Sequence, residues 1–264
     1  MQRLGFLGIG VLAEAVIRGL QQAESQHARG GRYQFHLSPR SEDRSRKLAD
    51  AYVNVHREDS NEAVVVASDV VFLAIRPQQI DLLAGLPFRR EQTIVTFLAG
   101  TPLARIRDLL PADTRLARVI PLPGIRYRRG PIVMTPAEPV VEDLFGQLGD
   151  LIVVDKESDL AATGVVSGLM SSHFQLQNTA AAWLEKSGLP PHQAALYVRS
   201  MFAGLGEIGL AAAHAGEEID PRDYETPGGL NECGRAFFKD RHWFDQSTAA
   251  LDAIDAHSRK LSKP

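Results

Sequence analysis

The sequence predicts an α/β protein in which a doubly wound, mostly parallel sheet is followed by an all-helical C-terminal part. Over the first 155 residues, short apolar runs alternate with segments of helical spacing, as in a sheet that helices cover on both faces. A glycine-rich turn follows the first apolar run. Beyond residue 155 the chain is rich in alanine and keeps helical spacing to its end. We therefore divide the chain into residues 1–155 and 156–264.

The expected strands are short apolar runs at residues 4–7, 34–37, 53–55, 70–75, 93–97, 115–120, 131–134 and 152–154. The run at 70–75 is apolar at every position, which is typical of a strand buried on both faces. Helices are expected between these strands at 12–22, 41–51, 61–67, 78–83 and 102–109. In the second part we expect one long helix at 159–186 and further helices at 191–213, 230–239 and 247–261.

Composition excludes several classes of function. A net charge of −3 gives no basic field for binding nucleic acid. The single cysteine, Cys233, cannot form an intramolecular disulfide, and the eight histidines lack ligand spacing, so we expect no metal. The N-terminus lacks the pattern of a signal peptide, and the apolar runs are too short to cross a bilayer. We expect a cytoplasmic protein with no membrane partner.

The first turn carries a motif for binding a dinucleotide. Gly8, Gly10 and Ala13 form the pattern G-x-G-x-x-A after a strand and before a helix. Gly8 permits a tight turn, Gly10 allows the backbone to approach a pyrophosphate, and Ala13 allows the helix to pack closely on the strand. We therefore interpret residues 1–155 as a NAD(P)-binding Rossmann domain. The alternative is a glycine-rich turn that binds no ligand.

The end of the second expected strand favours NADP(H), with NAD(H) as a further possibility. An NAD site usually has an acidic residue there, but no acid occurs before Glu42. Ser38 can hydrogen-bond a 2′-phosphate, and Arg40 can pair with it as a cation. The alternative is that Ser38 caps a helix and Arg40 is a solvated loop residue.

Motifs along nearly the whole chain resemble the pyrroline-5-carboxylate reductase family, whose members pass a hydride from NAD(P)H to a cyclic imine and form proline. The matching segments are residues 5–15, 61–64, 69–78, 99–100, 118–121, 188–190 and 226–229. The resemblance implies a Rossmann domain joined to helices that interlock two subunits. It also implies that the cofactor is bound near Gly8, Gly10, Val11, Leu12, Asn61, Ala74, Arg76, Pro77, Ala99 and Gly100.

The departures from the family pattern lie in the substrate half of the site. Leu122-Pro123-Gly124 stands where the family has N-T-P, and residues 167–173 replace S-G-S-G-P-A-Y. Leu230-Asn231 stands where the family has two threonines that meet the substrate carboxylate and imine. A leucine cannot replace the hydrogen bond of a hydroxyl.

The candidates for orienting or protonating a substrate are His173, Thr226 and Asn231, with Ser171 and Ser172 beside the histidine. For each an alternative stays open: His173 as a satisfied core or interface histidine, Asn231 as a helix N-cap, and the serines as small residues that ease helix packing. The basic loop 126–129 captures an anion or is a solvated basic patch.

These observations predict a homodimeric, NADP-dependent reductase of the C=N bond in a small, anionic, cyclic imino acid. The long apolar helix at 159–186 needs cover, which the C-terminal helices of a second subunit would supply. Two alternatives remain: an NADP-dependent dehydrogenase of another small substrate, and a non-catalytic NADP-binding regulatory protein that Leu122 and Leu230 would favour.

Overall fold

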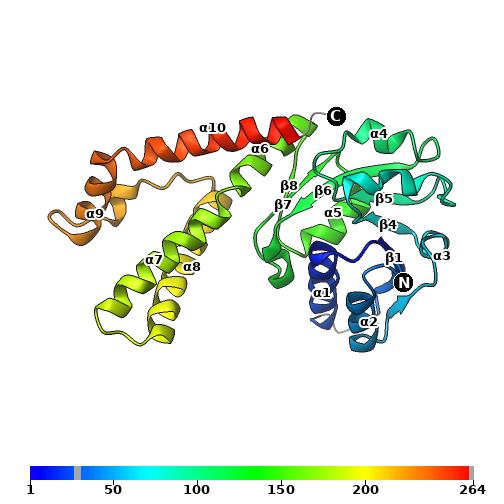
Figure 1. Ribbon diagram of the computed structural model, residues 1–264, viewed down its shortest axis with the longest axis horizontal. Coiled ribbons are helices and arrows are strands. Elements are labelled where there is room, and N and C mark those ends of the chain that lie inside the picture. Colours follow the sequence, from blue (N-terminus) through cyan, green and yellow to red (C-terminus); the bar gives the residue numbers. More distant parts are fainter. Residues whose placement is uncertain (27–30, 262–264) are drawn as a thin grey trace. The chain divides into compact units, whose positions relative to one another are not determined.

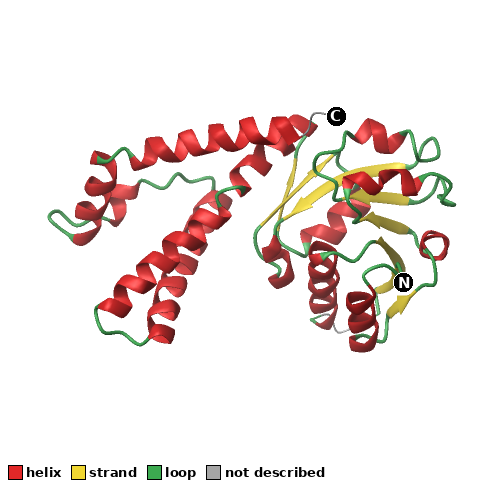
Figure 2. Cartoon of the chain, in the orientation of Figure 1, coloured by secondary structure: helices red, strands yellow, loops and turns green. Residues whose placement is uncertain are grey.

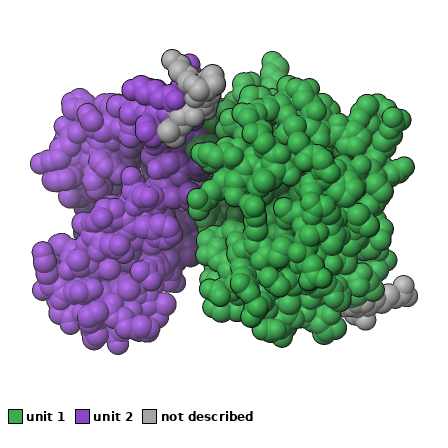
Figure 3. Space-filling view, turned by 45° about the vertical axis from the view of Figure 1, so that its right-hand side comes forward, with its two compact units in different colours: residues 1–164, 261–264 green, residues 165–260 purple. Residues whose placement is uncertain are grey.

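The computed structural model describes residues 1–26 and 31–261 and divides the chain into two compact units. Unit 1 contains Met1–Gly164 and unit 2 contains Val165–Lys260 (Figure 3). The boundary expected at residue 155 precedes α6 (Glu157–Ser167), whereas the two units meet within this helix. Residues 262–264 of the expected second part lie outside the described residues.

Unit 1 is built on an eight-stranded sheet with the order β3-β2-β1-β4-β5-β6-β7-β8 (Figure 1). The strands are β1 (Gln2–Leu7), β2 (Tyr33–Leu37), β3 (Val55–Arg57), β4 (Val70–Leu73), β5 (Thr93–Thr96), β6 (Arg115–Pro121), β7 (Pro131–Thr135) and β8 (Asp150–Val153). Strands β1 to β6 are parallel to one another, with Phe6 beside Leu37 and Phe72. Strand β7 is antiparallel to β6 and parallel to β8.

Helices cover both faces of this sheet (Figure 2). One face, which includes Phe6, Phe35 and Phe72, forms a core with α1 (Val11–Ser25), α2 (Glu42–Ala51), α5 (Pro139–Gly146) and η2 (Pro123–Tyr127). The other face, which includes Leu7 and Leu73, packs on α3 (Asn61–Ala67), η1 (Pro77–Leu83) and α4 (Leu103–Arg107). The apolar runs of β1, β4 and β5 supply residues to both cores, because alternate side chains point to opposite faces.

Unit 2 is helical throughout the residues that the structure describes. It contains α7 (Met170–Lys186), α8 (Pro191–Ala215), η3 (Pro221–Tyr224), α9 (Leu230–Asp240) and α10 (Trp243–Leu261). Helices α7 and α8 lie side by side as a hairpin (Figure 1). Their contact buries a small core of Ala181, Ala194 and Val198.

The structure corrects the expectation of one long helix at 159–186. The chain forms α6 and α7 with a break at Gly168 and Leu169. The N–H groups of these two residues bond to the carbonyls three residues earlier, at 3.0 and 3.1 Å, which tightens the turn. A Cβ at position 168 would lie 3.0 Å from two atoms of Ile254, so the close approach of α10 requires glycine.

Other differences are smaller. Helix α5 was not expected, and the expected strand at 53–55 forms at Val55–Arg57. The segment expected as a helix at 78–83 is the 3₁₀ helix η1, and α10 begins four residues earlier than expected, at Trp243 rather than residue 247. In the part of the chain that the structure describes, no helix has both the length and the apolar character needed to cross a membrane.

Candidate active site

The glycine-rich turn after β1 is shaped by close backbone packing. Gly8 has φ +92°, and a Cβ at this position would lie 2.7 Å from the carbonyl oxygen of Ala74, so a side chain would be excluded by both strain and contact. A Cβ at Gly10 would face open space. Helix α1 begins after Gly10 without a side-chain cap. Its first N–H groups are therefore available to an anion.

A cavity of about 720 Å³ lies beside this turn. It is lined by residues that follow β1, β2 and β4, namely Gly8, Ile9, Gly10, Arg40, Ser41, Glu42, Asp43, Arg44, Ala74, Ile75, Arg76 and Gln79. The carboxyl ends of neighbouring parallel strands meet here, which is where open α/β sheets bind ligands. Three arginines and the uncapped end of α1 give the cavity groups that suit phosphates.

Ser38 lies beside the cavity but does not line it. The residue is fully buried, and its hydroxyl oxygen accepts a hydrogen bond from the N–H of Gly8 at 2.9 Å. It does not cap α2 either, because the N-cap of α2 is Ser41. The Ser38 hydroxyl faces the glycine turn, where the pairing of β1 with β2 brings it, and its contact with a 2′-phosphate stays a prediction.

The structure gathers Gly8, Gly10, Arg40, Ala74 and Arg76 at the cavity, as the sequence analysis expected. The other expected cofactor residues are not among those that line it, although all lie in unit 1: Val11 and Leu12 in the first turn of α1, Asn61 at the start of α3, Pro77 at the start of η1, and Ala99 and Gly100 after β5. Their roles stay predictions.

An ion pair between a buried arginine and a partly exposed glutamate anchors the loop that follows β5. The Arg118 side chain, 4% exposed, donates to Glu157 at 2.6 Å and to the carbonyl of Thr101. The carboxylate of Glu157 also accepts the N–H of Leu103 at 3.1 Å. Burial lowers the pKa of the Arg118 guanidinium, and the charge of Glu157 opposes this shift. The pair thereby ties β6, the 97–103 loop and the start of α6 together.

In unit 2, His173 is held within the α7–α8 hairpin. Its Nε2 lies 2.7 Å from the Nε2 of Gln177, one helical turn further along. Its ring packs edge-on against Phe202, with ring centroids 5.4 Å apart. These contacts agree with the alternative of a satisfied histidine, because one ring nitrogen already has a partner.

The loop before α9 uses its polar groups locally. The amide of Asn231 donates to the carbonyl of Tyr224 at 2.7 Å, and the N-cap of α9 is Gly229, so Asn231 is not the N-cap. The carboxylate of Glu232 accepts the N–H of Gly228 at 2.6 Å. Thr226 is exposed, and its carbonyl accepts the N–H of Gly229. Leu230 is 92% exposed, so the loop presents an apolar side chain.

The basic loop 126–129 lies away from the cavity. Arg128 donates to the carbonyl of Gln147 at 2.8 Å and to the side chain of Gln26. Gln26 is the C-cap of α1, at the opposite end of that helix from Gly10. Arg128 therefore braces the end of α1, and capture of an anion by this residue at the cavity is excluded.

Comparisons with known proteins extend over the whole chain. A family model described as "NADP oxidoreductase coenzyme F420-dependent" matches residues 3–100. Pyrroline-5-carboxylate reductase 2 of Bacillus subtilis is 24% identical over 278 residues, covering 100% of this chain and 96% of the relative. A second relative, pyrroline-5-carboxylate reductase of Staphylococcus saprophyticus, is 25% identical and covers 88% of each chain. Both relatives are pyrroline-5-carboxylate reductases, and this chain is similar to them over most or all of its length.

Solved structures of similarly named proteins share the fold of this chain. The solved pyrroline-5-carboxylate reductase from Streptococcus pyogenes has a TM-score of 0.77 at 21% identity, with 98% of each chain covered. The pyrroline carboxylate reductase from Plasmodium falciparum, solved with NADP bound, has a TM-score of 0.78 at 16% identity, covering 99% of this chain and 98% of that one. The chain thus shares the fold of these structures at low sequence identity.

Several residues that line the cavity were missed by the sequence analysis. Arg44, Ser41 and Gln79 line the cavity. Gln79 accepts the N–H of Arg76 at 3.1 Å and so fixes the turn after β4. Position alone could have found Arg44, because it follows Arg40 by four residues at the start of a helix. Among the described residues, no group of three or more His, Cys, Asp or Glu side chains is placed to hold a metal ion.

Proposed function

We propose that the protein is an NADP(H)-dependent reductase that transfers a hydride to the C=N bond of a small cyclic imine. The observation that carries the proposal is the cavity, in which the glycine turn and Arg40, Arg44 and Arg76 meet at the carboxyl ends of the strands. The names of the full-length relatives supply the reaction class. A cytoplasmic location is part of the proposal and rests on the sequence alone.

The residues of the cavity fit the phosphates of the cofactor. The open space beside Gly10 and the uncapped start of α1 would hold the pyrophosphate. Arg40 would pair with the 2′-phosphate, which distinguishes NADP(H) from NAD(H). NAD(H) remains a usable cofactor in the proposal, because the pyrophosphate contacts are common to both. The bound nicotinamide would supply the hydride.

The protein's task at the substrate is to hold the imine carbon close to the nicotinamide and to provide a proton. The hydride forms the new C–H bond, the C=N π electrons move to nitrogen, and nitrogen takes one proton. A protonated imine brings this proton itself, so His173, Thr226 and Asn231 are proposed to orient the substrate. His173 and Asn231 each already use a side-chain nitrogen in an internal hydrogen bond, which leaves each of them fewer groups for the substrate.

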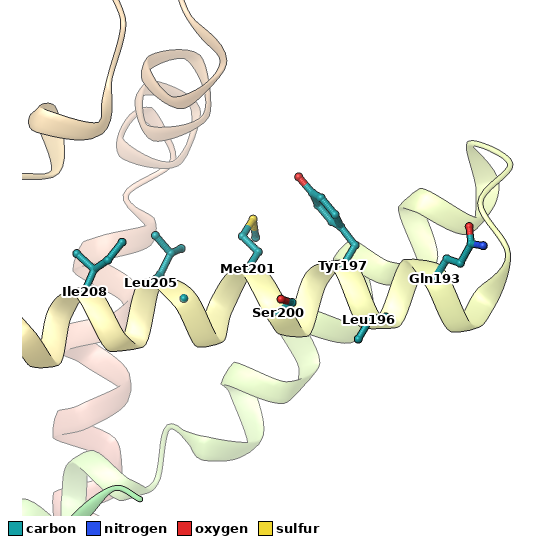
Figure 4. A pocket seen from close by; sticks show the side chains of 8 residues that line it. Gln193, Leu196, Tyr197, Ser200, Met201, Leu205 and Ile208 are labelled. Atoms are coloured by element: carbon teal, nitrogen blue, oxygen red, sulfur yellow. The ribbon is translucent and has the colours of Figure 1, made fainter.

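A homodimer through the C-terminal helices is also proposed. Helix α8 packs one face on α7 through Ala194 and Val198. An adjoining face carries Tyr197, Met201, Leu205 and Ile208 in a row at helical spacing (Figure 4), along a groove of about 630 Å³. These side chains are between 42% and 61% exposed. So large an apolar stripe on a soluble helix is typical of an interface.

The test of the proposed function has two steps. Binding of NADPH to the purified protein is measured first by fluorescence. Consumption of NADPH is then followed with pyrroline-5-carboxylate and with pyrroline, the cyclic imine that lacks the carboxylate. We expect binding and turnover of at least one imine, and failure to bind NADPH would contradict the proposal.

One observation favours a second candidate, a non-catalytic NADP-binding protein. The exposed side chain of Leu230 stands where the family has a hydroxyl that meets the substrate. Binding of NADPH without consumption by any cyclic imine or small keto substrate would favour this candidate. Turnover of a keto substrate alone would favour a dehydrogenase. The double variant Leu230→Thr with Leu122→Asn should raise activity on pyrroline-5-carboxylate if these two positions limit it.

A further inference from the structure

The hydrogen bond between Ser38 and Gly8 joins two parts of the cavity that lie far apart in the sequence. Gly8 belongs to the turn after β1, and Ser38 directly follows β2, 30 residues later. The acceptor is the side-chain oxygen of a residue with no exposed surface. The acceptor of this bond is therefore shielded from water, whereas Gly8 is only partly buried.

Ser38 itself is fixed on both sides. Its own N–H donates to the carbonyl of Phe6 at 3.0 Å, which continues the pairing of β1 and β2. The carbonyl of the next residue, Pro39, accepts a hydrogen bond from Arg57 at 3.3 Å. The hydroxyl is thus presented to Gly8 from a backbone that has little freedom to move.

Gly8 depends on the Ser38 bond, because its other close neighbour, the carbonyl of Ala74, restricts the space around it without bonding to its N–H. It adopts φ +92°, and its Cα approaches the Ala74 carbonyl so closely that a Cβ would lie 2.7 Å away. Without the Ser38 hydroxyl, the N–H of the partly buried Gly8 would lose the acceptor that holds it toward the sheet. The peptide would then gain by rotating toward water, which would displace the turn that lines the cavity.

We propose that Ser38 is a positioning residue for the cofactor, which sets the glycine turn for the pyrophosphate and does not touch the 2′-phosphate. This inference rests on the proposed function, because it concerns the same cavity. It separates two tasks that neighbouring residues carry. Arg40, at the cavity, distinguishes the two cofactors, whereas Ser38, behind the turn, serves both equally.

The test compares dissociation constants of Ser38→Ala for NADPH and NADH, measured by titration well below the unfolding temperature. Loss of one buried hydrogen bond should weaken the binding of both cofactors by about tenfold. The two factors should agree within about threefold, because the pyrophosphate is common to both ligands. Ser38→Cys, which keeps a weak acceptor of similar size, should show a smaller loss and serves if the alanine variant fails to fold.

Ser68→Ala is the matched control. Ser68 is also fully buried and makes a side-chain hydrogen bond to the backbone, donating to the carbonyl of Val64 at 2.6 Å. It precedes β4, at the end of the sheet opposite the cavity. Its loss should lower thermal stability, as the loss of Ser38 does, and leave both dissociation constants unchanged.

Two results would overturn the inference. Weaker binding of NADPH with unchanged binding of NADH in Ser38→Ala would mean that the hydroxyl contacts the 2′-phosphate. A fall in the melting temperature with both dissociation constants unchanged would mean that the bond only stabilises the fold. If the unmodified protein binds neither cofactor, the proposed function fails first and this inference fails with it.

Discussion

The polar groups of the two units are held in different ways. In unit 1, the partners are far apart in the sequence: Ser38 and Gly8 by 30 residues, and Arg118 and Glu157 by 39. In unit 2 they are neighbours: Gly228 and Glu232 are four residues apart, and Asn231 and Tyr224 seven. The apolar residues differ in the same sense. Unit 1 buries two large cores, whereas the described part of unit 2 has one buried cluster of three residues.

This difference indicates which contacts order each unit. Long-range contacts arise only when the sheet has formed, so the cavity of unit 1 is preorganised by the fold of that unit itself. Local contacts give the loop before α9 its shape but leave exposed apolar surface, including Leu230 and the stripe on α8. In the proposed dimer, the second subunit would cover this apolar surface of unit 2.

The largest effect on stability is expected when a long-range contact of unit 1 is removed. Arg118→Ala leaves the carboxylate of Glu157 and the carbonyl of Thr101 without their buried partner. Water can reach the partly exposed Glu157, whereas the carbonyl of Thr101 stays buried without its donor, so we expect the free energy of unfolding to fall by about 2–3 kcal/mol. Denaturant titration measures the change.

Arg3→Ala is the control for this prediction. It removes an exposed ion pair with Asp69, whose two side chains are 44% and 41% exposed. Such pairs contribute about 0–1 kcal/mol. Equal losses in Arg118→Ala and Arg3→Ala would show that burial of the Arg118 pair adds nothing.

The next largest effect is expected at the exposed stripe of unit 2. Leu205→Glu places a carboxylate in the middle of the proposed interface, and it should cost the dimer about 2 kcal/mol or more of association free energy. Light scattering coupled to size exclusion should show a shift toward monomer. Ala203→Glu adds the same charge at an exposed position outside the groove and should leave the mass unchanged. A monomeric unmodified protein would refute the proposed dimer.

Most of the fold followed from the sequence because its pattern is local. The apolar runs of β1, β4 and β5 predicted buried strands, and the spacing of α1 and α8 predicted helices. The break at Gly168 did not follow, because it depends on Ile254 in α10, a contact that spacing within a helix does not reveal. The reversal at β7 depends on how two strands pair and was also beyond local patterns.

The site shows the same limit. Gly8, Gly10 and Arg40 were predicted at the cavity because the glycine motif and the loop after β2 are short segments with their own chemistry. The hydrogen bond of Ser38 to Gly8 was not predicted, because a serine suits a phosphate, a cap or a backbone N–H equally well. Pairing of β1 with β2 decides among these. Likewise, the side-chain amide of Asn231 donates to the nearby carbonyl of Tyr224 and does not cap the helix.

A smaller effect should sharpen the assignment of the cavity. Arg40→Ala removes a cation that lines it, and we expect NADPH to bind about tenfold more weakly while NADH changes by no more than about twofold. Arg46→Ala, which removes an exposed arginine of α2 that pairs with Glu42, controls for the loss of positive charge nearby. Equally weaker binding of both cofactors would contradict the pairing of Arg40 with the 2′-phosphate. The roles of Arg40 and Ser38 would then not differ.

The smallest predicted effect tests whether distance in the sequence or burial makes the contacts of unit 1 strong. Arg3 and Asp69 are 66 residues apart, yet their pair is exposed. Hydrogen bonds from Arg3 lower the pKa of Asp69 in the folded protein, so the unfolded chain takes up this proton at a higher pH. The stability that Asp69 contributes is complete above about pH 4 and is lost as the pH falls toward the lower folded pKa.

Asp69→Asn should therefore flatten the rise of unfolding free energy with pH below about pH 4, by less than about 1 kcal/mol in total, since solvent screens the pair. Denaturant titrations across this range measure the slope, with Asp50→Asn on the exposed side of α2 as the control. A change as large as that expected for Arg118→Ala would mean that distance in the sequence alone makes a contact strong. A small change assigns the strength of the unit 1 contacts to their burial.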